Sequence, residues 1–251
     1  MSVAARAPST VPFRRRFSIP DPRWYYWGVA LLWVAFLAWD LSSHVREVVP
    51  HTWDLLPWLI VVEVVNLFPL WNWRYAYFTP DDAVAVAGML ALTPTQIGVT
   101  VFIGAFDLRE FKRDIALSKA VFNRSQVAAA IYLGSQGAHL VTPAPSESPY
   151  VLLLGLLALV VMMLVNYLVV GLGISLEHRY TIVRAVRQLK IGSIPDFALA
   201  LVSWAVLGVM LAVLYDQVHF FGLLAFLVPT LLGRQVLARS QMFIETRRAY
   251  R

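Results

Sequence analysis

Residues 150–176, YVLLLGLLALVVMMLVNYLVVGLGISL, decide the fold class of this chain. The stretch carries no charged residue. At a rise of 1.5 Å per residue it forms about 40 Å of helix. The hydrocarbon core of a bilayer is about 30 Å thick, and about 20 apolar residues cross it. The sequence therefore predicts a membrane-spanning helix here.

The composition of the whole chain extends this prediction. Of 251 residues, 59% are hydrophobic and 14% are charged, whereas charged residues make up about 25% of a soluble domain. The apolar segments use almost the whole length and leave no room for a separate folded domain. The absence of cysteine excludes disulfides, thiol catalysis and cysteine-held metal clusters. We therefore expect one all-α, polytopic bundle at residues 24–232.

Six apolar segments are long enough for full or nearly full crossings, and several end in the aromatic belts typical of membrane interfaces. They are residues 24–39, 55–71, 120–140, 150–176, 196–214 and 220–232.

A shorter pair, residues 83–92 and 96–106, is interrupted by Thr93-Pro94-Thr95. Each half is about 15 Å long as a helix. The pair is either one kinked span or a re-entrant hairpin of half-length helices. Basic residues occur on both sides of it, Arg74 before and five between 109 and 124 after. Because cytoplasmic segments are enriched in Lys and Arg, this charge distribution favours the hairpin.

The same rule predicts the orientation of the chain. With both termini in the cytoplasm, 20 of the 21 basic residues fall on the inner side and Arg46 alone falls outside. Residues 1–23 are predicted to be a disordered basic leader. Residues 177–191 and the C-terminal residues 233–251 are predicted to be amphipathic cytoplasmic helices. The prolines at 143, 145 and 149 indicate an outer loop.

Sequence motifs of soluble catalysis are missing. The chain has no phosphate-binding loop, zinc-protease motif, nucleophile elbow or dinucleotide fingerprint. No two histidines have the spacing that places metal ligands on one helical face, so we expect no metal site. The chain is expected to be neither an enzyme nor a cofactor carrier. The net charge is +6, and the basic residues lie beside apolar segments. Anionic lipids rather than nucleic acid are therefore the expected partners.

Polar residues inside the predicted spans are candidates for ligand binding, because such groups are costly in a membrane. Glu63 lies one helical turn before Asn66, on the same face. A second polar turn occurs at the start of the 120–140 span, and one amide lies within the long span. The full candidate set is Glu63, Asn66, Asn123, Arg124, Gln126 and Asn166. Hydrogen bonding within the bundle is the structural alternative to a ligand pocket.

Basic residues on the predicted inner face are candidates for contact with lipids or a protein partner. The set comprises Arg109, Lys112, Arg113, Arg179, Arg184, Arg187, Lys190, Arg247 and Arg248. The C-terminal helix repeats Val236, Phe243 and Tyr250 at seven-residue spacing, which favours lying on the membrane or self-association with another helix.

The order of these features resembles a known family. First come short helices around a proline, then a basic loop, and then residues 119–126, KAVFNRSQ. Later in the chain come Asn166, residues 226–229, FLVP, and Arg234. This resembles the N-terminal multi-pass membrane region of bacterial, notably actinobacterial, HD-GYP and GGDEF signalling proteins. The chain stops before any HD, GYP or GGDEF motif, so no catalytic residues carry over.

The resemblance implies a sensor-like or scaffold module of the bacterial plasma membrane, with a signalling partner in the cytoplasm. The alternative is a small-solute transporter or its substrate-binding subunit, using the broken 83–106 segment with Glu63 and Asn123. An intramembrane enzyme is the least favoured hypothesis, because no acid, base and nucleophile are paired.

Overall fold

A computed structural model describes residues 22–48, 52–67, 81–106, 110, 115–188, 194–229 and 231–232. The described chain is helical and contains no strand, which confirms the all-α prediction for these residues. The helices are α1 (Arg23–Ser43), α2 (Val45–Val48), α3 (Thr52–Leu67), α4 (Asp81–Ala91), α5 (Pro94–Gly104), α7 (Leu117–His139), η2 (Pro145–Glu147), α8 (Val151–His178), α9 (Ile182–Gln188) and α10 (Ile194–Val218). A further short apolar helix covers Phe220–Pro229.

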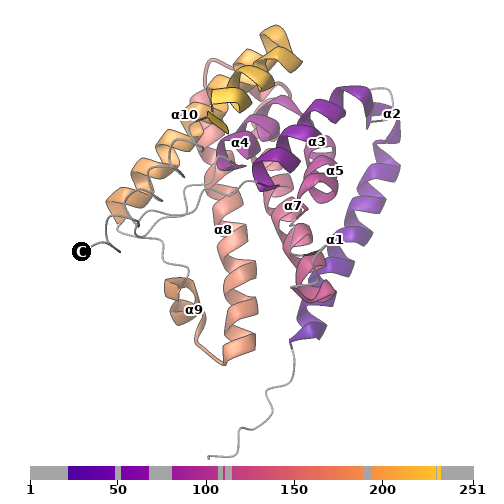
Figure 1. Cartoon of the computed structure of the whole chain (residues 1–251), viewed down its shortest axis with the longest axis vertical. Coiled ribbons are helices and arrows are strands. Elements are labelled where there is room, and N and C mark those ends of the chain that lie inside the picture. Colours follow the sequence, from indigo (N-terminus) through magenta and orange to yellow (C-terminus); the bar gives the residue numbers. More distant parts are fainter. Residues whose placement is uncertain are drawn as a thin grey trace, which may run out of the picture.

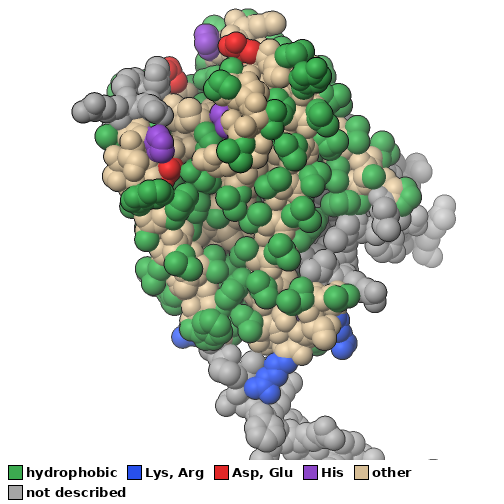
Figure 2. Space-filling model, turned by 180° about the vertical axis from the view of Figure 1, so that it is seen from behind, with side chains coloured by type: hydrophobic (Ala, Val, Ile, Leu, Met, Phe, Trp, Pro, Cys, Tyr) green, Lys and Arg blue, Asp and Glu red, His purple; other side chains and the backbone are tan. Residues whose placement is uncertain are grey.

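Three helices in this part of the chain are long and apolar enough to cross a membrane: α1, α8 and the Phe197–Val218 part of α10. Their outward faces carry large apolar side chains such as Leu32, Leu164 and Leu199, each more than half exposed. Figure 2 shows this apolar cover over most of the visible flank. An apolar exterior of this extent is typical of a protein solvated by lipid. The structure therefore supports the prediction of a membrane protein.

Helices α4 and α5 form a hairpin. Asp81 and Asp82 at the start of α4 line the same cavity as Val101 and Ala105 at the end of α5. A kinked span would carry these two ends to opposite sides of the bundle. Thr93 is the N-cap of α5 and forms a capping box. Its hydroxyl accepts from the Gln96 N–H, and the Gln96 side chain accepts from the Thr93 N–H.

The hairpin lies within the bundle. All residues of α4 from Ala83 to Leu90 are buried, and α4 packs against α3, α7, α8 and α10. The other arm, α5, packs against α1, α3 and α7. Figure 1 shows α3, α4 and α5 gathered toward one end of the bundle, while α1, α7 and α8 extend to the other end.

Some boundaries differ from those expected. Helix α8 continues to His178 and ends at Arg179, whose positive φ of 54° terminates the helix. The amphipathic helix expected at 177–191 therefore starts later, at Ile182, because residues 177 and 178 belong to α8; α9 is described from Ile182 to Gln188. The leader before residue 22 and the C-terminal helix expected at 233–251 lie outside the described residues.

Glycines allow the neighbours of α4 to approach it closely. A Cβ at Gly208 of α10 would lie 2.5 Å from the Val86 Cβ and 2.8 Å from the Ala83 carbonyl oxygen. A Cβ at Gly134 of α7 would lie 2.5 Å from the Met89 sulfur and 2.6 Å from the Ala158 carbonyl oxygen. Small residues at helix contacts are the usual means of bringing backbones together in membranes.

We expect Gly208→Ala to lower the free energy of unfolding by about 1–3 kcal/mol, because the added methyl group meets backbone and a β-branched side chain that cannot rotate away. Gly28→Ala in α1 is the matched control, since its Cβ would have no neighbour within 4 Å. Thermal unfolding of the two variants in detergent measures the difference. Equal stability of the two variants would contradict the close packing of α4 against α10.

Candidate functional site

The main candidate site is a cavity of about 110 Å³ between α3, α4, α5, α7 and α8. Its wall is mostly apolar and includes Ile97, Ile131 and Met162. Four polar residues interrupt this wall: Asn66, Asp81, Asp82 and Asn166. The volume corresponds to about three or four water molecules at about 30 Å³ each. The cavity therefore has room for a small polar species, and the polar residues in its wall come from three different helices.

The cavity lies deep in the bundle. Asn166 is near the middle of α8, which runs from Val151 to His178. Both ends of the hairpin line the cavity. The two aspartates lie in the first turn of α4. Carboxylates at a helix N-terminus are stabilised by the helix dipole and by free backbone N–H groups. Both aspartates are partly exposed, and their place in the first turn of α4 favours their charged form.

Asn166 contributes an acceptor without a partner in the described part of the chain. Its Oδ1 atom is buried and makes no hydrogen bond there. A buried amide oxygen without a hydrogen bond costs about 1–3 kcal/mol. Gln126 of α7 is also buried, with its Oε1 lacking a partner among the described residues, but it does not line the cavity.

A second polar group connects α3, α7 and the end of the hairpin. The Arg124 guanidinium donates to both carboxylate oxygens of Glu110 and stacks over the Phe106 ring, 3.5 Å from its centroid. The Phe106 N–H in turn donates to the Glu63 carboxylate at 3.4 Å. Both predicted residues, Glu63 and Arg124, thus bind neighbouring protein groups close to the end of α5.

The end of the bundle formed by the start of α1 and α7 and the end of α8 is joined by a polar clamp. The Glu177 carboxylate accepts from the Tyr26 hydroxyl at 2.8 Å and from the Lys119 ammonium at 2.7 Å. Phe122 packs against Tyr26 with ring centroids 4.9 Å apart. We call Tyr26, Lys119 and Glu177 the α1–α7–α8 clamp.

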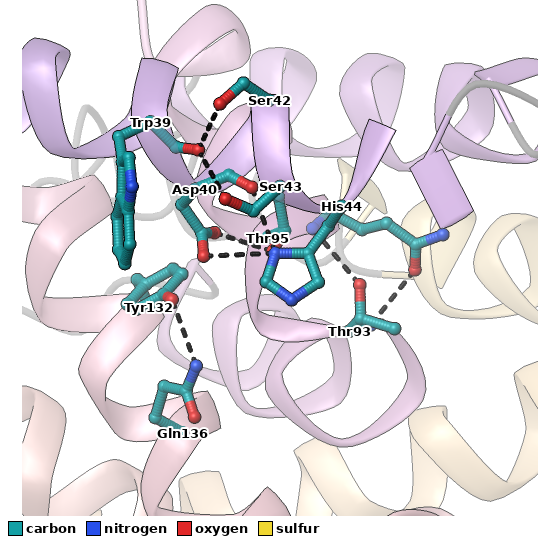
Figure 3. Close-up of polar contacts among 10 residues, drawn as sticks. Trp39, Asp40, Ser42, Ser43, His44, Thr93, Thr95, Tyr132 and Gln136 are labelled. Atoms are coloured by element: carbon teal, nitrogen blue, oxygen red, sulfur yellow. Dashed lines mark hydrogen bonds and ion pairs between the residues drawn. The ribbon is translucent and has the colours of Figure 1, made fainter. Parts of the chain in front are cut away.

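The opposite end contains a buried carboxylate that holds the tip of the hairpin (Figure 3). Asp40 is 4% exposed and accepts from the Thr95 hydroxyl at 2.6 Å. His44 Nδ1 lies 3.3 Å from Asp40 Oδ1 and 3.0 Å from the Asp40 carbonyl oxygen, so this nitrogen carries the proton. Nearby, Gln136 donates to the Tyr132 hydroxyl at 3.0 Å. The Asp40–Thr95 hydrogen bond joins α1 to the start of α5, next to the α4–α5 turn.

The structure brings together only part of the predicted ligand-binding set. Asn66 and Asn166 line the cavity, whereas Asn123, Arg124 and Gln126 do not. Asn123 faces outward because it lies on the exposed side of α7. The sequence reasoning missed Asp81 and Asp82, although an acidic pair directly before an apolar run is a signal for a helix N-terminus.

The predicted partner-binding residues are described only in part. Arg179 and Arg184 are exposed near the end of α8, and Arg184 lies over the Tyr180 ring at 4.5 Å. Arg187 falls in α9, but its side chain is not described. Arg109, Lys112, Arg113, Lys190, Arg247 and Arg248 lie outside the described residues. Among the described residues, no three His, Asp or Glu side chains are grouped in a way that could hold a metal ion.

No protein family model, curated protein or solved structure matches the chain. The resemblance to the membrane region of HD-GYP and GGDEF proteins therefore remains a prediction.

Thr95→Val is expected to lower the free energy of unfolding by about 1–3 kcal/mol, because it removes a donor from a buried carboxylate while preserving side-chain shape. Thr100→Val is the matched control. Thr100 is equally buried but donates to the Gln96 carbonyl of its own helix, an oxygen that keeps its helical partner. The free energy of unfolding of Thr100→Val should fall by less than about 1 kcal/mol. Equal losses on denaturant titration would show that the Asp40 contact does not anchor the hairpin.

Proposed function

We propose that this chain is a non-enzymatic, sensor-like or scaffold module of a bacterial cell membrane. In this proposal six spans and the re-entrant α4–α5 hairpin form the membrane bundle, and both termini are cytoplasmic. The inner face then binds anionic lipids and a signalling partner.

The distribution of charge supports this orientation. Exposed Lys and Arg side chains gather at one end of the described bundle, where Glu177 and His178 also lie, and a group of acidic residues and histidines gathers at the other end, as Figure 2 shows for one face. The basic end carries Arg23, Lys119, Arg179 and Arg184, and the opposite end carries Asp40, His44, Asp54, His139, Glu147, Asp216 and His219. Because Lys and Arg are enriched on the cytoplasmic side, the first end is assigned to the cytoplasm.

One observation carries the sensor proposal: α8 lines the cavity and also supplies the clamp residue at the inner end. Asn166 contributes to the cavity wall. Three turns later, Glu177 joins α8 to α1 and α7. The backbone hydrogen bonds of a continuous helix make it stiff, so we expect a displacement at the cavity to reach the clamp at the end of α8.

The exposed inner surface supports contact with lipid headgroups. Arg179 and Arg184 are exposed beside Ile182 and Val183, which are 44% and 63% exposed. A short segment with both apolar and basic exposed side chains is suited to the membrane interface, where apolar groups enter the acyl region and cations meet phosphate.

The alternative function is transport of a small solute. The observation that favours it is the cavity at the base of two half-length helices, because many transporters build their substrate sites from interrupted helices near the membrane midplane. Glu63 of α3, which accepts from the Phe106 N–H just beyond the end of α5, would then control access from the inner side.

The orientation is tested by single-cysteine labelling, which is direct because the chain contains no cysteine. Glu147→Cys between α7 and α8 should react with a membrane-impermeant maleimide in intact spheroplasts. Arg184→Cys in α9 should react only after the membrane is permeabilised. Both native side chains are exposed. The reverse labelling pattern would invert the proposed orientation.

The scaffold function is tested by photocrosslinking in cells from positions between 233 and 251. A defined protein partner should be captured, and the product should be lost in the double variant Arg247→Glu, Arg248→Glu. Recovery of lipid and self-dimers only would contradict the scaffold. Solute uptake into proteoliposomes that is abolished by Glu63→Gln would favour the transporter instead.

A further inference from the structure

The cavity between α3, α4, α5, α7 and α8 is a void among buried apolar side chains. Its wall includes Val84, Ile97, Val101, Ile131 and Met162. Each of these residues is at most 6% exposed. Protein interiors are close-packed, and side chains that face a void lose the dispersion contacts that a filled interior would give them. A molecule that occupied this space would restore those contacts.

The cavity is apolar at one end and polar at the other. Helices α3 and α8 pass α4 in the opposite direction, with Trp58 and Gly155 beside the C-terminal half of α4. In each of these three helices, a polar lining residue lies one turn further from the hairpin turn than an apolar lining residue. The pairs are Asn66 with Val62, Asp81 with Ala85, and Asn166 with Met162. The polar residues therefore share the end of the cavity that lies away from the hairpin turn.

The two arms of the hairpin meet at the apolar end. A Cβ at Gly88 of α4 would lie 2.5 Å from the Ile97 Cδ1 of α5. The same Cβ would lie 3.6 Å from the Trp58 ring of α3. The apolar end is thus covered by packed side chains. A ligand would place its hydrocarbon body at this end and its polar group at the opposite end.

The volume limits the ligand to a small molecule. An apolar cavity of about 150 Å³ binds benzene. At about 110 Å³, this cavity has room for a hydrocarbon body of about four carbons. A neutral hydroxyl loses far less than an ion on leaving water, and it can both donate to and accept from amide and carboxylate groups. Short-chain alcohols combine such a head with a body of this size.

We propose that the cavity binds a small neutral amphiphile of the short-chain alcohol class, with its hydrocarbon body against Ile131 and Met162 and its hydroxyl at the polar end. Burial of apolar surface supplies most of the affinity. The inference rests on the proposed function in one respect, because it takes this cavity as the ligand site of a sensor. A ligand bound here without a crosslinked partner overturns the scaffold function and leaves the ligand site. A crosslinked partner without a bound ligand does the reverse.

The test uses the full chain in liposomes, with a diazirine analogue of butanol as a photoreactive probe. After irradiation, the labelled residues are identified by mass spectrometry. Cavity residues such as Ile131 and Met162 should be labelled saturably, and excess butanol should reduce this labelling. Adamantanol should not reduce it, because its cage is too bulky for the cavity. Labelling of the exposed Leu164 and Leu199 should instead rise linearly with probe concentration.

Ala130→Val adds two carbon atoms to the cavity wall. It should reduce the labelling of Met162 about tenfold or more, because it fills space that the hydrocarbon body needs. Ala128→Val is the matched control, since Ala128 is equally buried on α7 but does not line the cavity. The control should keep the labelling of the unmodified chain. If Ala130→Val fails to fold, Val101→Ile makes a smaller addition to the wall from α5 and should reduce the labelling in the same direction.

Equal labelling of Met162 in the filled variant and in the unmodified chain would overturn the proposal, because the probe would then bind elsewhere. Labelling confined to lipid-facing residues, or reduced equally by butanol and adamantanol, would also overturn it. Either result would show that the alcohol only dissolves in the surrounding lipid.

Discussion

The close approach of backbones around α4 is the constraint on which the rest of the structure depends. Helices in lipid gain little from apolar contact alone, because acyl chains are as apolar as leucine, so van der Waals packing has to supply the difference. Here α4 is buried from Ala83 to Leu90. It reaches this position because Gly208 and Gly134 leave space for Val86 and Met89. Removal of either space would separate the hairpin from the long helices that enclose it.

The ends of the hairpin are restrained differently from its body. At the turn, the Thr95 hydroxyl bonds to a carboxylate that is almost fully buried. Beyond the end of α5, the Phe106 N–H donates to Glu63 and the Phe106 ring lies under the Arg124 guanidinium. Apolar packing does not specify rotation of a smooth helix about its axis, whereas directional polar contacts do. These two sets of contacts thus hold α5 at its start and just beyond its end.

Much of this architecture follows from the sequence. The 150–176 run predicted α8, and Thr93-Pro94-Thr95 predicted the break between α4 and α5, because uncharged length and a proline cap are local signals. The cavity was not predictable in the same way. Asp81 and Asp82 precede an apolar run as they would at any membrane surface, and their depth depends on how far the hairpin is inserted. That depth is a property of contacts distant in sequence, such as Gly208 with Ala83.

The polar turn at residues 123–126 shows a second limit on what the sequence predicts. Helical periodicity places Asn123, Arg124 and Gln126 on different faces, so one turn supplied an outward amide, an ion pair and a buried amide. Polarity within a span indicates that a group needs a partner, but not whether that partner is protein, water or ligand.

The length of α8 has a consequence for how this protein responds to its lipid surroundings. Its 28 residues form about 42 Å of helix, whereas the 21 residues of α1 form about 32 Å, close to the hydrocarbon thickness. Neighbours of such unequal length cannot both match one bilayer, so α8 either tilts or extends beyond it. A thicker or thinner bilayer would change that tilt, and with it the height of Glu177 and α9 relative to the membrane surface. Bilayer thickness is therefore a mechanical input to the same helix that lines the cavity.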